Sequence, residues 1–117
     1  EKIKALMKNK PIIAAGKTTL TQLAALIKEC RFIVTNDTGP MHIAGAVDTP
    51  AVVIYGPTSP EVGVKGPYGK SFIAVGKEGL HCRPCGTHGG KKCKEKTFAC
   101  MNEISPREVI LSCQKLI

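Results

Sequence analysis

The stretch FIVTNDTGPMH, residues 32–42, decides the fold, because three apolar residues run into a polar turn that leads to Gly39 and Pro40. A second apolar run, AVVIY, occupies residues 51–55. Neither run alternates with polar residues, which is typical of strands covered on both faces of a parallel sheet. We therefore predict an α/β fold with strands at 32–34 and 51–55, joined by a short helix over 39–47 in a right-handed crossover.

Weaker patterns extend this unit toward both ends of the chain. Residues 1–10 resemble the end of an amphipathic helix that stops at Pro11, and residues 11–15 are a candidate strand. The run FIAV at residues 72–75 predicts another strand, after a loop rich in Gly and Pro at residues 56–69.

Two capping boxes predict where longer helices begin. Thr19 and Gln22 form the first, and the apolar face of that helix is expected to contain Leu20, Leu23, Ala24, Ile27 and Cys30. Ser105 and Glu108 form the second, with Pro106 at the first helical position. That helix is expected to bury Val109, Ile110, Cys113 and Leu116.

Length and composition limit the function classes. The 117 residues suffice for one small domain, and the longest apolar runs are far too short to span a membrane. The chain begins at Glu1 without an export signal, so we expect a soluble, cytoplasmic protein cut from a longer one. The net charge of +8 favours anionic partners, which include phosphorylated metabolites, an acidic membrane surface and nucleic acid.

The turn after the first predicted strand has the residues of a phosphate-binding loop. Ligands of open α/β sheets bind beyond the carboxyl ends of the strands, where this turn lies. Gly39 lets a ligand approach the backbone, and the amides that begin the helix favour an anion. Thr38 and His42 are able to donate hydrogen bonds to a diphosphate. Asp37 caps the helix, faces the phosphate across a bridging divalent cation, or does both.

Two further positions are candidates for substrate contact. Thr58 follows the second strand, so its loop lies beside the first loop if the strands are neighbours; the alternative is an ordinary rigid turn. Lys17 follows the candidate strand at 11–15 and either lines the pocket or is a solvated lysine. The segment Gly16–Lys17–Thr18 is not a P-loop, because Pro11 stands where that motif requires Gly.

Four of the six cysteines lie in a segment without periodicity, residues 79–101, as Cys82-x2-Cys85-x7-Cys93-x6-Cys100. Four thiolates are able to enclose a structural zinc ion, with His81 or His88 as substitute ligands. Lys91, Lys92, Lys94 and Lys96 would lower the energy of nearby thiolates. Free reduced thiols and an adventitious disulfide are the alternatives. Cys30 and Cys113 are expected to be buried core residues.

The order of these motifs resembles glycosyltransferase family 9, the heptosyltransferases. The resemblance rests on segments that together cover nearly the whole chain: residues 16–20, 23–27, 36–44, 50, 55–60, 82–85, 100–101 and 104–106. The combination of Asp37-Thr38-Gly39-x-x-His42 with Gly56-Pro57-Thr58 is specific, although each piece alone is weak. The cysteine-rich insert is most similar to the heptosyltransferase II type.

The resemblance implies a GT-B enzyme that moves heptose from ADP-heptose to the lipopolysaccharide inner core with inversion. This chain resembles the C-terminal, Rossmann-like, nucleotide-sugar-binding half, which would span residues 1–117. The resemblance places Asp37, Thr38, Gly39 and His42 around the diphosphate and sugar, and the backbone near Thr18 at the adenine. The general base would belong to the absent N-terminal acceptor domain, so we expect no sugar transfer by this chain alone.

Two other functions fit part of the sequence. A zinc-ribbon-like nucleic-acid-binding module would explain the charge and the cysteines, but it does not explain an apolar strand that runs into Asp37-Thr38-Gly39. We therefore expect no nucleic-acid partner. An enzyme of another GT-B family would share the phosphate loop but not the cysteine-rich insert. The basic ends of the chain fit peripheral contact with the inner face of the inner membrane.

Overall fold

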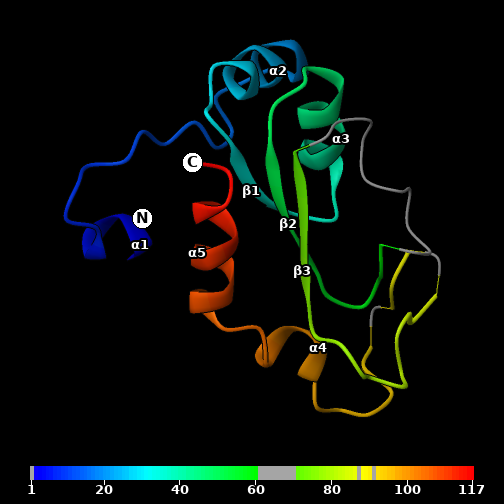
Figure 1. Cartoon of the computed structure of the whole chain (residues 1–117). Helices are drawn as coiled ribbons and strands as arrows, with labels where there is room; N and C mark the ends of the chain where they lie inside the picture. Colours follow the sequence, from blue (N-terminus) through cyan, green and yellow to red (C-terminus); the bar gives the residue numbers. More distant parts are fainter. Residues whose placement is uncertain (1, 61–70, 87, 91) are drawn as a thin grey trace.

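The computed structural model describes residues 2–60, 71–86, 88–90 and 92–117, and its core is a parallel sheet (Figure 1). The strands are β1 (Ile33–Asn36), β2 (Ala51–Tyr55) and β3 (Phe72–Gly76), in the order β1-β2-β3. Because β2 is central, its residues are almost completely buried. The predicted α/β class with a parallel sheet is confirmed, and the strands at 51–55 and 72–75 are found within one residue of their predicted bounds.

Within the described ranges, five helices accompany the sheet: α1 (Lys2–Leu6), α2 (Leu20–Lys28), α3 (Gly39–Ala46), α4 (Ala99–Asn102) and α5 (Pro106–Gln114). Helices α3 and α5 lie on opposite sides of the sheet (Figure 1). Successive strand residues face opposite sides. Ala51, Val53 and Tyr55 therefore pack together against Met41 and Ala44 of α3, with Ile27 of α2 in the same cluster. None of the described helices is long and apolar enough to cross a bilayer.

Both predicted capping boxes are present. The Thr19 hydroxyl accepts the Gln22 amide at 3.3 Å, and the Gln22 side chain accepts the Thr19 amide at 2.9 Å. At α5, the Ser105 hydroxyl accepts a hydrogen bond from the Glu108 amide at 3.2 Å, and the Glu108 carboxylate accepts one from the Ser105 amide at 2.7 Å. These caps follow from sequence because every partner lies within one helical turn.

The predicted strand at residues 11–15 is wrong. Those residues form no strand, and Ile12 is 95% exposed. A strand needs a neighbour to satisfy its amides and carbonyls, and β1 pairs only with β2 in the described sheet. The predicted helix at residues 1–10 is shorter than expected, because α1 ends at Leu6, well before Pro11. β1 is an edge strand with alternating burial, so the expectation that both its faces are covered is also wrong.

Three helix positions differ from the predicted burial. Leu20 is exposed because it is the first residue of α2, ahead of the turn that packs on α3. Cys30 is exposed because α2 ends at Lys28, so helical periodicity no longer places it on the apolar face. Ile110 is 57% exposed, because the face of α5 that packs on the sheet is centred on buried Ser112. The short α4 was not predicted from the sequence.

Candidate functional site

The loops after β1 and β2 meet at the carboxyl end of the sheet. Because these strands are parallel neighbours, with Asn36 opposite Ile54, the segments that follow them leave the sheet side by side. The Thr58 hydroxyl donates a 2.8 Å hydrogen bond to Oδ2 of Asp37. Thr58 is only 7% exposed. The structure therefore brings Asp37 and Thr58 together, as expected for strands that are neighbours.

Helix α3 begins at Gly39, one residue later than it would if Asp37 were its N-cap. The N-cap is Thr38, with extended backbone (φ −151°, ψ 178°), so the alternative that Asp37 caps the helix is wrong. The Thr38 hydroxyl donates to the Asn36 carbonyl at 3.3 Å and caps no amide. Gly39 is the first helical residue, as predicted, and Pro40 is the second. Pro40 has no amide N–H, and the Met41 amide donates to the Thr38 carbonyl at 3.0 Å. Among the described residues, no side chain caps the remaining Gly39 amide.

The space in front of this helix end is open. A Cβ atom added at Gly39 would have no neighbour within 4 Å. His42, in the first turn of α3, is exposed. An uncapped helix N-terminus with free space before it is a suitable place for an anion, because its amides and the helix dipole both favour negative charge.

Lys17 and Thr18 lie on a different segment, just before the Thr19 cap of α2. Both are exposed, and the Lys17 amide closes a turn by donating to the Ala14 carbonyl at 3.0 Å. Within the described part of the chain, no hydrogen bond joins either residue to the β1–α3 loop. Their contact with a ligand stays a prediction.

Arg83 is a site residue that the sequence analysis missed. Its guanidinium donates to the Thr58 carbonyl from Nε at 3.2 Å and from Nη2 at 2.7 Å, and Nη1 donates to the Lys77 carbonyl. Arg83 thus ties the segment after β3 to the loop after β2. The signal in the sequence is an arginine between Cys82 and Cys85.

The cysteine-rich segment also packs directly against the β2 loop. The Cys85 amide donates to the Pro57 carbonyl at 2.8 Å. A Cβ added at Gly56 would overlap the side chain of Met101, and one at Gly89 would lie 2.9 Å from Pro57 Cγ. Gly89 also has a φ of 75°, which favours glycine, whereas a side chain at Gly56 would require the Met101 side chain to move. The cysteine-rich segment therefore supports the loop after β2, whose Thr58 is hydrogen-bonded to Asp37.

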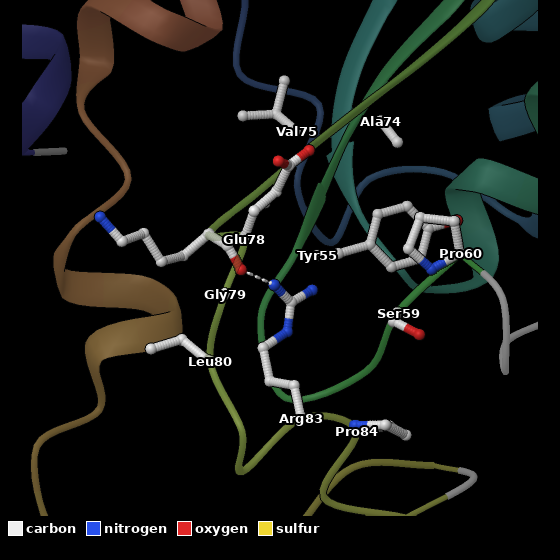
Figure 2. Close-up of a pocket in the computed structure, with 12 residues that line it drawn as sticks. Tyr55, Ser59, Pro60, Ala74, Val75, Glu78, Gly79, Leu80, Arg83 and Pro84 are labelled. Carbon is white, nitrogen blue, oxygen red and sulfur yellow. Dashed lines mark hydrogen bonds between the residues drawn. The ribbon is translucent and has the colours of Figure 1, made fainter.

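A hollow of about 390 Å³ lies beside these loops, at the carboxyl ends of β2 and β3 (Figure 2). Tyr55 lines it and is fully buried. Burial raises the pKa of Tyr55, and the nearby Asp37 carboxylate raises it further. The Tyr55 hydroxyl lies 3.6 Å from Met41 Sδ of α3. Tyr55 therefore contacts α3 through its hydroxyl and also lines this hollow.

The cysteines do not form a ligand set in the described residues. All six are free thiols, and no group of three or more His, Cys, Asp or Glu side chains in the described ranges is placed to hold a metal ion. Hydrogen bonding from the Phe98 backbone is the main cause that lowers the Cys93 pKa, so the expectation that lysines lower it is not supported. Burial raises the pKa of Cys100. The expected zinc ion stays a prediction.

Known proteins similar to this chain come from one family. A family model described as glycosyltransferase family 9 (heptosyltransferase) matches residues 1–97. Lipooligosaccharide heptosyltransferase 2 of Campylobacter jejuni is 34% identical over 101 residues, 86% of this chain and 30% of that protein. Lipooligosaccharide heptosyltransferase 2 of Haemophilus influenzae is 55% identical over 47 residues, 40% of this chain and 14% of that protein.

A solved structure agrees with these sequences. The crystal structure of a family 9 glycosyl transferase from Veillonella parvula matches with a TM-score of 0.77 and 31% identity, over 98% of this chain and 31% of that one. The chain spans less than a third of the length of these relatives. Because the family model covers most of the sequence and the parallel sheet matches that structure, the chain belongs to glycosyltransferase family 9.

Proposed function

We propose that residues 1–117 form the donor-binding, Rossmann-like domain of a GT-B glycosyltransferase that moves heptose from ADP-heptose to the lipopolysaccharide inner core. The observation that carries the proposal is the uncapped α3 N-terminus beside the Asp37–Thr58 hydrogen bond. This arrangement offers the Gly39 amide and the positive end of the α3 dipole at the carboxyl end of a parallel sheet, where ligands of open α/β folds bind. The names of the heptosyltransferase relatives supply the sugar.

The proposed role of this domain is to stabilise the leaving diphosphate. As the acceptor hydroxyl attacks the anomeric carbon with inversion, the bond to the diphosphate breaks and negative charge develops on it. The α3 amides, the Thr38 hydroxyl and His42 meet that charge. Thr58 donates to one oxygen of Asp37, so this carboxylate has a hydrogen-bond partner other than the α3 N-terminus.

The proton of the acceptor hydroxyl must go to a general base, and we assign that base to another domain of the intact protein. The isolated chain is therefore expected to bind nucleotide but to transfer no sugar. The net charge of +8 fits an enzyme that works beside an anionic membrane surface.

Calorimetric titration with ADP, UDP and GDP tests the proposed function. We expect ADP to bind, and Thr38→Ala to weaken ADP binding about tenfold because one hydrogen bond to an anion is lost. Thr21→Ala, on the exposed surface of α2, is the matched control. Absence of ADP binding together with tight binding of an RNA oligomer would instead support a nucleic-acid-binding module.

The same titration with and without Mg²⁺ separates the two proposed environments of Asp37. With Thr58 as its partner, Asp37 needs no bridging cation, so we expect chelation to change ADP affinity by less than about threefold. A large loss of affinity on chelation, abolished in Asp37→Ala, would show that a divalent cation joins Asp37 to the diphosphate.

A further inference from the structure

Residues 92–98 of the cysteine-rich segment, with the sequence KCKEKTF, form an exposed basic loop that the proposed donor role does not use. Its three lysines, Lys92, Lys94 and Lys96, are all exposed. They take part in none of the ion pairs found among the described residues. The only acidic residue of the basic loop, Glu95, lies 3.9 Å from His81. The positive charge of the loop is therefore not neutralised by ion pairs within the described ranges.

An aromatic side chain lies at the end of the same loop. Phe98 is 51% exposed, whereas every other aromatic side chain in the described ranges is buried or half-buried. The backbone of Phe98 has a φ of 51°, which bulky residues rarely adopt, and its carbonyl accepts the Met101 and Asn102 amides at 2.9 Å. The Phe98 backbone is therefore fixed at the start of α4 while half of the residue stays in solvent.

Lysines beside an exposed phenyl ring match the surface of an anionic bilayer. Each lysine near such a surface is attracted to it, and the attraction weakens as salt is added. A phenyl ring gains free energy when it leaves water for the boundary between headgroups and acyl chains. A single-stranded nucleic acid matches less well, because successive bases stack on several aromatic platforms and Phe98 is the one exposed aromatic residue that the structure describes.

The position of the basic loop relates it to the donor loop. The Cys85 amide donates to the Pro57 carbonyl at 2.8 Å, and Met101 of α4 lies against Gly56, so the cysteine-rich segment packs on the loop after β2. Figure 1 shows the chain between β3 and α4 beyond the carboxyl ends of β2 and β3. A bilayer on the basic loop would therefore lie near the end of the sheet at which the donor is proposed to bind.

From this combination we infer that the basic loop is a membrane-contact surface, which binds an anionic phospholipid bilayer through Lys92, Lys94, Lys96 and the ring of Phe98. The inference goes beyond donor binding and rests on the proposed function only for its consequence, which is that a lipid-anchored acceptor is held near the donor-binding end of the sheet. The loop contains none of the residues assigned to the donor, so its loss leaves nucleotide binding intact.

The test measures how much of the intact protein that contains this chain sediments with vesicles of phosphatidylethanolamine and phosphatidylglycerol. Vesicles of phosphatidylcholine alone, which carry no net charge, are the comparison. One variant combines Lys92→Gln, Lys94→Gln and Lys96→Gln. The other is Phe98→Asn, because asparagine tolerates a positive φ better than most residues.

Each variant has a matched control. The combination of Lys4→Gln, Lys8→Gln and Lys10→Gln removes the same charge from exposed positions at the other basic end of the chain. Ile110→Gln removes an apolar side chain from α5 at a position that is 57% exposed, close to the exposure of Phe98. Melting temperature establishes that all four variants fold.

We expect the lysine variant to lose about 100-fold in partition onto the anionic vesicles and Phe98→Asn to lose about tenfold, with the ADP Kd of both within about twofold of the unaltered protein. Both controls should bind the vesicles like the unaltered protein.

The membrane-contact surface would be overturned if the unaltered protein did not bind the anionic vesicles, or if the test variants lost no more than their controls. Binding of an RNA oligomer that disappears with the same three lysines, without binding to vesicles, would assign the basic loop to nucleic acid instead. Failure of the unaltered protein to bind ADP would overturn the proposed function and not the membrane contact, so the two failures are distinguishable.

Discussion

The Thr58 hydroxyl lies 2.8 Å from the Asp37 carboxylate and joins two loops that are 21 residues apart in the chain. Thr58 is in turn held through its carbonyl by Arg83, which lies a further 25 residues along. The loop that carries Asp37 is therefore positioned by a residue of the cysteine-rich insert, through Thr58.

Replacing Thr58 by valine tests the first of these bonds. Val has nearly the shape of Thr but donates no hydrogen bond, so Asp37 loses a partner in a part-buried place. We expect the free energy of unfolding to fall by about 1–2 kcal/mol and ADP binding to weaken severalfold. Urea denaturation and calorimetry measure the two effects. Thr58→Ser keeps the hydroxyl and should restore ADP binding; if it behaves like the valine variant, the hydrogen bond is not the cause.

Replacing Arg83 tests the second bond. Arg83→Lys keeps the charge but cannot reach two carbonyls with a planar fork. We expect a loss of roughly 2 kcal/mol in the free energy of unfolding and a lower ADP affinity, since the Thr58 loop is no longer held. Arg107→Lys, on exposed α5, serves as the control and should change neither quantity. If Arg83→Lys, like the control, changed neither quantity, the charge of residue 83 alone would be enough to support the loop.

The α5 capping box predicts a specific pH dependence. Hydrogen bonds from the Ser105 backbone and hydroxyl hold the pKa of Glu108 below its ordinary value of 4.5. A depressed folded-state pKa gives a stabilisation that is present above the unfolded value and is lost as pH falls through the folded value. We expect α5 to lose protection in amide hydrogen exchange as the pH drops below the pKa of an unperturbed glutamate. Glu108→Gln should remove this dependence because its side-chain amide does not titrate, and an unchanged pH profile in that variant would contradict the assignment.

The cysteine-rich segment predicts an order of thiol reactivity. Backbone hydrogen bonds lower the pKa of Cys93, whereas burial raises that of Cys100. Because the thiolate is the reactive form, iodoacetamide should modify Cys93 before Cys100, which peptide mass spectrometry resolves. A zinc ion held by Cys82, Cys85, Cys93 and Cys100 would instead protect all four thiols. Metal content below about a tenth of an equivalent, in protein purified without chelator, would reject such a site.

Local signals account for the parts of the fold that were predicted. The capping boxes at Thr19 and Ser105 depend on partners three residues away. The central strand, residues 51–55, is apolar throughout because both of its faces are covered. The segment at 11–15 is also apolar but forms no strand, because composition does not supply a neighbour to pair with.

The sequence by itself determined the α/β class, the helix that begins at Gly39 and the family, since each depends on short-range pattern or on the order of motifs. Tertiary structure alone decided that Asp37 turns to Thr58 and that Arg83 supports their loop. The physical reason is that these contacts join segments separated by many residues, and only parallel strand pairing and packing of the insert bring their polar atoms within hydrogen-bonding distance.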